Sequence, residues 1–511
     1  MEATAWVLQG VAAARAAGAG VRFTSGGSKV AGSELAGRIE RAVQGLYEAG
    51  LAPGDEVLLG IDPGIDAFVL LCACVRLEAQ VTHLQGIPGT GELLGRRPTS
   101  GRRWIIAQRS LYLAGARSPL AAYLRRLGAE FPNLGRMTAT HVRTGGRLPL
   151  VGGRVVDGRG FLGPVPDGWT AAPPVARTDD RGSGTGADDV RRLQLDAGAD
   201  GRALGVRHSG RALGASIGQL GAVTDAGPGD TVFTNDPWVM LAALAAGAAI
   251  DLAPDDVIPR EVLGHLEGGG ATHAWLEPSV ARRLAVHVDQ LDRTLPEALR
   301  HLVLHRDHVD PRTLELLHAA SGPGLRITSV YGATEWFPVA AIGSRERIAW
   351  TGAGDLVGEP LAGIDVRVEA GRLELRGDGG PVEAERADDG WWRTGDVARL
   401  DPEDGIVLLG RAGSVLERDG HTWLPAVIEQ VAERVPGVGF AAFVVREDRG
   451  ALFVEPDPSS TLGAKELRAD VEAALERDLE VGPDEVQVLP RLPRSGGGFR
   501  MDRRQLARWM A

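Results

Sequence analysis

The chain has 511 residues, of which 44% are apolar and 24% charged, and its formal net charge is −11. This length leaves room for two to four domains and a large core, and the composition is typical of globular proteins. The acidic balance argues against nucleic acid or an anionic membrane surface as the main partner.

Cysteine usage and hydropathy predict a cytoplasmic protein. The only cysteines, Cys72 and Cys74, lie in the apolar run 68–75, where we expect core residues, and so few cysteines fit a reducing compartment. The apolar run 239–250 ends at Asp251, well short of the roughly 20 residues of a membrane span. The N-terminal residues lack the basic start and long apolar core of a signal peptide. We therefore expect no membrane span.

Short apolar runs alternate with amphipathic stretches along the chain, which predicts an α/β protein with βαβ units and mostly parallel sheets. A buried strand at 56–61 is followed by a helix at 65–77. Further on, strands at 302–304 and 327–330 flank a helix at 312–319. The segment 143–189 is rich in Gly, Pro, Arg and Asp, which predicts a long connection with one short hairpin near 154–160.

A change of pattern near residues 410–411 predicts a domain boundary. Beyond it lies a compact α/β pattern, with helices at 425–434 and 464–477 and strands at 440–445 and 452–455. We therefore expect a large N-terminal domain, 1–410, that binds the acyl group and nucleotide, and a small C-terminal domain, 411–511.

Three motifs occur in a fixed order. Tyr-Gly-Ala-Thr-Glu at 331–335 follows a predicted strand, Trp-Arg-Thr-Gly-Asp at 392–396 is followed by Gly-Arg at 410–411, and Leu-Pro-Arg-Ser at 492–495 precedes a glycine-rich turn. Together they resemble the adenylate-forming ligases, which include acyl-CoA synthetases, luciferases and peptide-synthetase adenylation domains. The resemblance covers nearly the whole chain. It implies a large layered N-terminal domain and a small mobile C-terminal α/β domain.

Within that superfamily the chain is most similar to the β-lactone synthetases of bacterial olefin biosynthesis. The likeness rests on 331–335 followed by Pro338-Val339 and by Ile-Gly-Ser-Arg-Glu at 342–346. In such enzymes ATP adenylates the carboxylate of a β-hydroxy acid. The hydroxyl group then displaces AMP and closes a four-membered lactone.

The resemblance implies catalytic roles for two residues. Glu335 would hold Mg²⁺ near the phosphates, because a carboxylate suits a hard cation, and it stands with Arg393 as a catalytic residue. A second carboxylate, that of Asp396, would accept hydrogen bonds from the ribose hydroxyls.

The resemblance also implies a nucleotide-binding set. Tyr331 would stack on adenine, with Thr334 beside it in the same motif, and Arg411 would lie at the hinge side of the nucleotide. In the phosphate-binding loop, Gly198 and Gly201 keep the spacing of the family.

That loop departs from the family pattern in charge. It is usually rich in Ser, Thr and Gly and ends in Pro-Lys-Gly, but residues 196–206 read Asp-Ala-Gly-Ala-Asp-Gly-Arg-Ala-Leu-Gly-Val. Asp196 and Asp200 replace hydroxyl residues, and Leu204 stands at the lysine position. A carboxylate about 5 Å from a phosphate charge costs roughly 3 kcal/mol at an effective dielectric constant near 20.

Two further departures affect nucleotide binding. Relatives carry a small Gly-Ala-Pro turn beside the adenine, whereas residues 306–308 read Arg-Asp-His, so Arg306 would bring bulk and charge into that space. The catalytic lysine that should follow the C-terminal glycine-rich turn is replaced by Phe499. The chain has only two lysines, Lys29 and Lys465, and arginine is not an equivalent substitute.

These observations leave three functions open. In the first, the protein no longer adenylates, needs no cofactor, and binds an acyl compound or a partner enzyme of its pathway. In the second, it is an active ATP- and Mg²⁺-dependent ligase or cyclase for a hydroxy or fatty acid, with Arg202 or Arg500 supplying charge. In the third, it transfers a lactone or acyl group without a nucleotide. The small-molecule partner is a carboxylic acid or acyl compound in each.

The histidines His301, His305 and His308 do not predict a metal site. The first two have the spacing of a helical zinc pair, but the residues between them read as a strand and no glutamate completes the motif.

Overall fold

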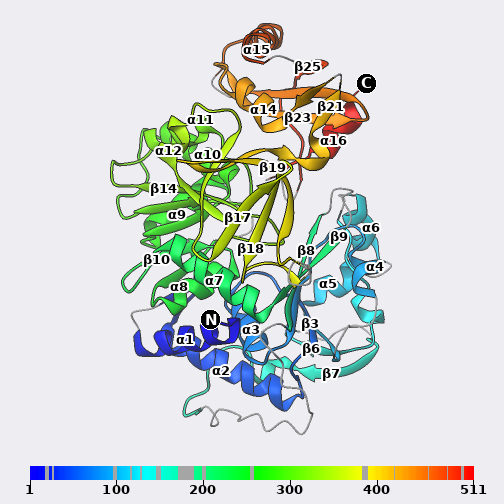
Figure 1. Ribbon diagram of the computed structural model, residues 1–511. Coiled ribbons are helices and arrows are strands. Elements are labelled where there is room, and N and C mark those ends of the chain that lie inside the picture. Colours follow the sequence, from blue (N-terminus) through cyan, green and yellow to red (C-terminus); the bar gives the residue numbers. More distant parts are fainter. Residues whose placement is uncertain are drawn as a thin grey trace.

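The computed structural model shows a layered α/β molecule whose last hundred residues form a separate group of elements (Figure 1). The structure describes residues 1–17, 22–25, 28–95, 101–115, 118–126, 129–145, 151–170, 189–197, 203–253, 258–382, 389–418, 420–457, 460–479, 482–495 and 500–510.

A seven-stranded sheet has the order β7-β6-β5-β3-β4-β8-β9, parallel except for the β8–β9 hairpin. Its strands are β3 (Glu56–Gly60), β4 (Gln80–His83), β5 (Arg103–Ala107), β6 (Ala139–Arg143), β7 (Gly153–Asp157), β8 (Val190–Ala197) and β9 (Ala203–Ser209). The predicted strand 56–61 is confirmed as β3, and the helix 65–77 as α3 (Ile65–Arg76).

The hairpin predicted near 154–160 is wrong. Strand β7 pairs in parallel with β6 at the sheet edge, and residues Gly158–Gly160 form a 3-10 turn. The glycines of that segment favour a turn, but the alternating residues before it satisfy their backbone groups on β6 instead.

A thirteen-stranded sheet has the order β17-β18-β19-β20-β16-β15-β14-β13-β12-β10-β11-β1-β2. The parallel part consists of β1 (Arg22–Ser25), β10 (Thr231–Thr234), β11 (Ala249–Leu252), β12 (His273–Leu276), β13 (His301–Leu304) and β14 (Arg326–Tyr331). The antiparallel strands are β2 (Ser28–Ala31), β15 (Ala340–Gly343), β16 (Asp355–Pro360), β17 (Ile364–Glu369), β18 (Arg372–Gly377), β19 (Trp392–Asp401) and β20 (Gly405–Arg411).

Helices join and cover these sheets. Those of the large body include α1 (Ala3–Ala17), α2 (Gly32–Glu48), α7 (Gly210–Thr224), α8 (Pro237–Ala245), α9 (Pro259–Gly268), α10 (Pro278–Gln290), α11 (Pro311–Ala319) and α12 (Ser344–Ala349). Smaller helices are α4 (Thr90–Gly95), α5 (Arg109–Ala114) and α6 (Pro119–Arg126). The strands and helix predicted between 302 and 330 are confirmed as β13, α11 and β14.

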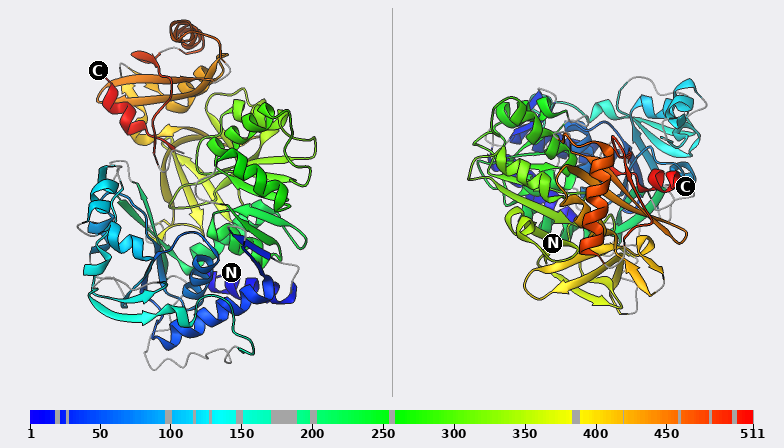
Figure 2. Two further views of the ribbon diagram at one scale, coloured as in Figure 1. Left: turned by 180° about the vertical axis from the view of Figure 1, so that it is seen from behind. Right: turned by 90° about the horizontal axis from the view of Figure 1, so that it is seen from above.

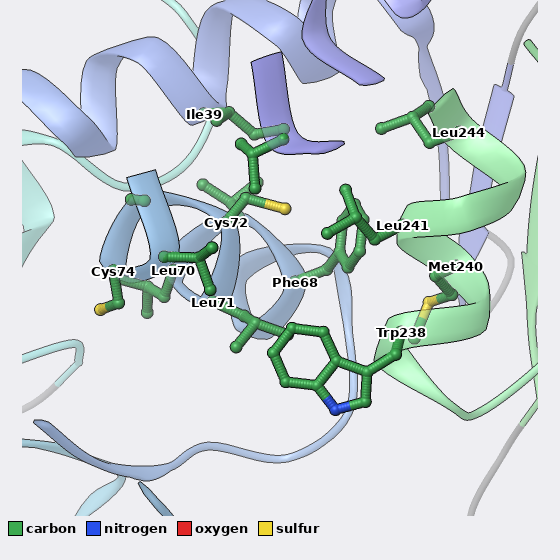
Figure 3. Close-up of a cluster of buried hydrophobic side chains, with 14 of the residues drawn as sticks. Ile39, Phe68, Leu70, Leu71, Cys72, Cys74, Trp238, Met240, Leu241 and Leu244 are labelled. Carbon is green, nitrogen blue, oxygen red and sulfur yellow. The ribbon is translucent and has the colours of Figure 1, made fainter. Parts of the chain in front are cut away.

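The main apolar core lies where α2, α3 and α8 meet, as Figure 3 shows. Phe68 of α3 faces Leu241 of α8, and Cys72 and Cys74 are buried in the same core. Burial raises the pKa of the Cys74 thiol to about 12. Both cysteines are therefore packing residues, as the sequence predicted.

The elements after β20 build sheets and cores of their own (Figure 2). They are β21 (Leu416–Arg418), β22 (His421–Trp423), α14 (Pro425–Glu433), β23 (Val438–Arg446), β24 (Arg449–Pro456), α15 (Ala464–Asp478), β25 (Glu485–Val488), β26 (Arg494–Ser495), β27 (Arg500–Met501) and α16 (Arg503–Trp509). We call this group the C-terminal unit. The predicted helices and strands of this region are confirmed; the domain boundary at 410–411 stays a prediction.

One buried arginine connects the C-terminal unit to the large body. Arg282 of α10 is 5% exposed and donates to Asp310 (3.2 Å), to Asp457 (2.7 Å) and to the carbonyl oxygen of Gly439 (3.0 Å). Its guanidinium also lies over the ring of Phe440, 4.5 Å from the centroid. A buried ion pair is costly to break because it leaves a charge without its partner.

We expect Arg282→Met to loosen the C-terminal unit. Without the guanidinium, the carboxylates of Asp310 and Asp457 lose the positive charge that they share. The binding of the C-terminal unit to the large body should therefore weaken by about 3 kcal/mol. Limited proteolysis should then release a fragment of about 100 residues much faster than in the wild type, because exposed linkers are the preferred sites of nicking. The matched control is Arg283→Met, at the neighbouring exposed position of α10. Equal release rates for the two variants would contradict this role of Arg282.

Candidate nucleotide and acyl site

A cavity of about 330 Å³ lies between the end of β14, the strands β19 and β20, and the C-terminal unit. Three of the residues assigned from the sequence line it, namely Tyr331, Asp396 and Arg411. Charged neighbours from other elements complete its wall, among them Arg306, His308, Arg347, Asp355, Glu429 and Arg503.

The carboxylate of Asp396 is held on both oxygens. Tyr331 donates its hydroxyl hydrogen to Oδ2 over 2.5 Å, and Nε of Arg411 lies 3.2 Å from Oδ1. The register of β19 against β20 places Asp396 directly opposite Arg411, and Arg411 also donates to the carbonyl oxygen of Thr394 over 2.9 Å. Burial and the neighbouring Asp396 raise the pKa of Tyr331 well above its ordinary value, so the phenol stays protonated and donates.

Two glycines make this arrangement possible. A Cβ at Gly332 would lie 2.7 Å from a ring carbon of Phe337 and 2.9 Å from the carbonyl oxygen of Trp336. Gly395 has φ of +81°, a left-handed conformation that costs other residues free energy. The turn after Tyr331 and the strand before Asp396 therefore both require glycine.

The loop that contains Thr334 and Glu335 is fixed from the other sheet. His208 of β9 hydrogen-bonds through Nε2 to the carbonyl oxygen of Thr334 over 3.1 Å. Burial and the charge of Arg192 lower the pKa of His208 to about 3, so the imidazole is neutral and donates. The sequence assigned no role to His208; its place shortly after the glycine-rich loop was the available signal.

Glu335 is partly buried in this loop and forms no ion pair with any residue that the structure describes. Within the described segments no three His, Cys, Asp or Glu side chains are grouped to hold a metal ion. Mg²⁺ is commonly held by one or two carboxylates together with substrate phosphates, so Glu335 fits such an ion only when a nucleotide supplies further ligands. Its magnesium-binding role stays a prediction.

Arg393 lies on the other face of β19. Its side chain is 75% exposed and its Nε is 2.7 Å from Oε1 of Glu374, a buried carboxylate that Arg367 also contacts. Arg393 does not line the cavity that contains Tyr331 and Asp396. Its catalytic role is an untested prediction that this geometry does not support.

Arg306 lines the cavity, but its guanidinium group pairs with two carboxylates of the protein. The guanidinium lies 3.3 Å from Asp236 and 3.5 Å from Glu277. The backbone of Arg306 has φ of +76°, which costs a non-glycine residue roughly 1–3 kcal/mol. Arg306 contributes bulk to the cavity wall, and the two carboxylates balance its charge. That this space would hold adenine stays a prediction.

His308 joins the large body to the C-terminal unit. Its Nδ1 is 2.9 Å from Asp355 of β16, and its Nε2 is 3.2 Å from Glu433 of α14. Both ring nitrogens face carboxylates, so both donate only when the imidazole is protonated. Although desolvation alone lowers it, the two carboxylates raise the pKa of His308 well above its ordinary value.

The segment that the sequence assigned to phosphate binding begins on β8 and ends on β9, which pair with each other. Asp196 pairs with Leu204, and Ala197 with Ala203, across the two strands. The side chain of Leu204, at the lysine position, is 47% exposed. Gly198 and Gly201, like Phe499, lie outside the described residues, so their predicted roles are untested.

Neither lysine of the chain lies in the cavity wall. Lys29 belongs to β2, at the edge of the thirteen-stranded sheet, and Lys465 belongs to α15. His301 of β13 is buried, and its ring nitrogens face the carbonyl oxygen of Thr224 and the hydroxyl of Thr328.

Sequence comparison identifies the family. The AMP-binding enzyme family matches residues 11–381, and the chain belongs to that family. It is 25% identical to a salicylyl-CoA synthase / salicylate adenylyltransferase of Streptomyces sp. over 526 residues, with 95% of this chain and 90% of the relative covered. It is 27% identical to an isonitrile lipopeptide synthase of Streptomyces coeruleorubidus over 380 residues, which cover 67% of this chain but only 25% of that protein.

Solved structures show the same fold. The amide bond synthetase McbA from Marinactinospora thermotolerans superposes with a TM-score of 0.75 at 20% identity, with 99% of both chains covered. ATP-bound MatB from Rhodopseudomonas palustris gives a TM-score of 0.74 at 21% identity, again over 99% of both chains. The adenylate-forming ligase fold predicted from the three motifs is therefore confirmed. Among the described helices, none is long and apolar enough to cross a membrane.

The geometry of His308 predicts a pH-dependent contact. Because its pKa is raised in the folded protein, its stabilising effect is complete below the unfolded pKa and is lost as pH rises through the elevated value. The contact also weakens at low pH, where Glu433 takes up a proton. The pKa of Glu433 is raised, mainly by burial. Asp355 stays ionised over this range, because Arg347 and His308 outweigh burial and lower its pKa.

We expect His308→Gln, which keeps an amide donor but removes the charge, to lower the melting temperature by several degrees near neutral pH. The deficit should shrink toward zero as pH rises through the elevated pKa of His308. Thermal melting of both proteins from pH 6 to 10 measures this. A deficit that is constant, or that grows with pH, would show that charge on His308 does not hold the C-terminal unit.

Proposed function

We propose that this chain binds a carboxylic acid or acyl compound in the pocket inherited from its family, and that ATP-dependent activation of the acid is lost or strongly weakened. The observation that carries the proposal is the position of the two lysines, both outside the cavity wall. Charge that develops on a phosphoanhydride needs a positioned cation, and an arginine already paired with a carboxylate is a poor replacement for a free ammonium group.

The charges around the cavity support the same proposal. Asp396, which the family resemblance assigns to the ribose hydroxyls, already accepts from Tyr331 and pairs with Arg411. Arg503 of α16 is bound to Glu429 through both carboxylate oxygens. A nucleotide would have to compete with these internal partners.

An active ligase is the second candidate. The assembly of Tyr331, Asp396 and Arg411 around one cavity favours it, as does the full-length similarity to an adenylyltransferase. Such an enzyme would adenylate a hydroxy or fatty acid and form a β-lactone or another acyl product, with ATP and Mg²⁺ as cofactors and Arg202 or Arg500 in place of the lysine.

Calorimetry with ATP and Mg²⁺, together with pyrophosphate exchange across a panel of hydroxy and fatty acids, separates the two candidates. We expect no measurable heat of binding at millimolar ATP and no acid-dependent exchange. Micromolar ATP binding, or exchange stimulated by one acid, would establish the active ligase instead. Direct titration of the same acids without nucleotide tests the acid-binding part independently.

A charge-corrected loop should regain affinity for ATP. Replacing Asp196 and Asp200 by Thr removes two repulsive charges, and Leu204→Lys adds an attractive one. Since each pair contributes roughly 3 kcal/mol at an effective dielectric constant near 20, we expect a gain on the order of hundredfold or more. Inorganic triphosphate should gain as much as ATP, because the change concerns phosphate alone. Tight ATP binding by the unmodified protein would refute this account of the loop.

A further inference from the structure

Basic side chains gather on one face of the seven-stranded sheet. Arg192 of β8 is the register partner of Val81 on β4 and of His208 on β9. Register partners lie side by side and point to the same face of a sheet. His83, two residues after Val81, shares that face, which therefore carries Arg192, His83 and His208 in a row.

The guanidinium of Arg192 lies close enough to Asp236 to feel its charge but does not bind it directly. It forms no ion pair and no hydrogen bond with any residue that the structure describes, and it lies over the ring of Trp238, 5.0 Å from the centroid. Burial lowers the pKa of Arg192 to about 10, so the side chain is still charged at neutral pH. The nearby carboxylate of Asp236 is bound by Arg306.

Two further polar atoms beside Arg192 are buried without a partner. Trp238 is 4% exposed, and its Nε1 meets no acceptor among the described residues. Figure 3 shows why: the carbon rings face the apolar core and the nitrogen edge points away from Leu241 and Phe68. The Nε2 atom of His83 is likewise buried and unpaired in the described part of the chain. Its imidazole is neutral, because burial and the charge of Arg192 lower its pKa to about 4.

Unpaired buried donors are costly and rare in native proteins. Two such atoms, one from β4 and one from α8, lie beside the charged side chain of Arg192 on β8, and together they indicate that an oxyanion completes the cluster. A planar carboxylate matches the guanidinium edge of Arg192, while the indole N–H and the imidazole each supply one more donor.

The cluster lies close to the cavity but is distinct from it. Arg306 lines the cavity and pairs with Asp236, which accepts from the backbone N–H of Trp238 over 2.9 Å. On the other side, His208 links the basic row to the carbonyl oxygen of Thr334. A carboxylate held at Arg192 would thus be separated from an acid in the cavity by the Arg306–Asp236 pair.

We propose that Arg192, Trp238 and His83 form a subsite for a second carboxylate, so that the ligand of this protein is a dicarboxylic acid. The inference rests on the acid-binding part of the proposed function and names its substrate class. Arg192 sets specificity; it does not take part in activation of the first carboxylate.

Matched pairs of acids test the subsite. Glutarate, adipate and pimelate are titrated by calorimetry against pentanoate, hexanoate and heptanoate, without nucleotide. At least one diacid should bind ten times more tightly than the monoacid of equal length, and monomethyl adipate should behave as a monoacid. Arg192→Met should reduce the preference to less than threefold, and Arg192→Lys should retain part of it. Arg468→Met on the exposed face of α15 is the control and should change nothing.

The outcomes separate the two claims. Equal binding of diacids and monoacids, or a preference that survives Arg192→Met, overturns the subsite and leaves acid binding in place. Absence of binding by every acid overturns both. If Arg192→Met fails to fold, two other titrations test the subsite: monomethyl adipate against the wild type, and the diacids against Arg192→Lys. Pyrophosphate exchange driven by a diacid would refute loss of activation while supporting the subsite.

Discussion

The hydrogen bond from Tyr331 to Asp396 fixes the shape on which the candidate site depends. Strands β20, β16 and β15 lie between β19 and β14 in the sheet, so in a flat sheet the two residues would be about 19 Å apart at a spacing of about 4.8 Å per strand. Their side-chain oxygens are instead only 2.5 Å apart, and the lengths of the two side chains alone do not span the difference. The antiparallel half of the sheet must therefore curl over the end of the parallel half, and the cavity is the space enclosed by that curl.

Sequence patterns predicted most elements because the buried strands and amphipathic helices have clear periods. Of the residues assigned from the motifs 331–335 and 392–396, Tyr331 and Asp396 line the cavity, whereas Arg393 does not. The pairing of β7 was missed because an exposed edge strand has no apolar run to mark it; its side chains are mostly exposed. Partners such as His208 and Thr334 are 126 residues apart, and no local pattern reports a contact of that separation.

Arginine usage has consequences throughout the structure. A guanidinium offers several donors in a fixed plane, and here most of the arginines near the cavity bind internal carboxylates: Arg411 binds Asp396, Arg503 binds Glu429, and Arg347 binds Asp355. Such pairs organise the walls but leave little charge free for a ligand. Arg192 differs because its neighbour is the ring of Trp238, and this is why the interior of the large body, beyond the cavity itself, is the better place to expect a bound anion.

The tripeptide 306–308, which departs most from the family beside the adenine, connects both regions. Arg306 pairs with Asp236 next to the acid subsite, and two residues later His308 pairs with Glu433 of the C-terminal unit. The backbone between them starts from the left-handed conformation of Arg306. An anion bound at Arg192 would change the electrostatic potential at Asp236 and therefore the strength of the Asp236–Arg306 ion pair. Residues 306–308 of this chain therefore contact both Asp236, beside the proposed subsite, and Glu433 of the C-terminal unit.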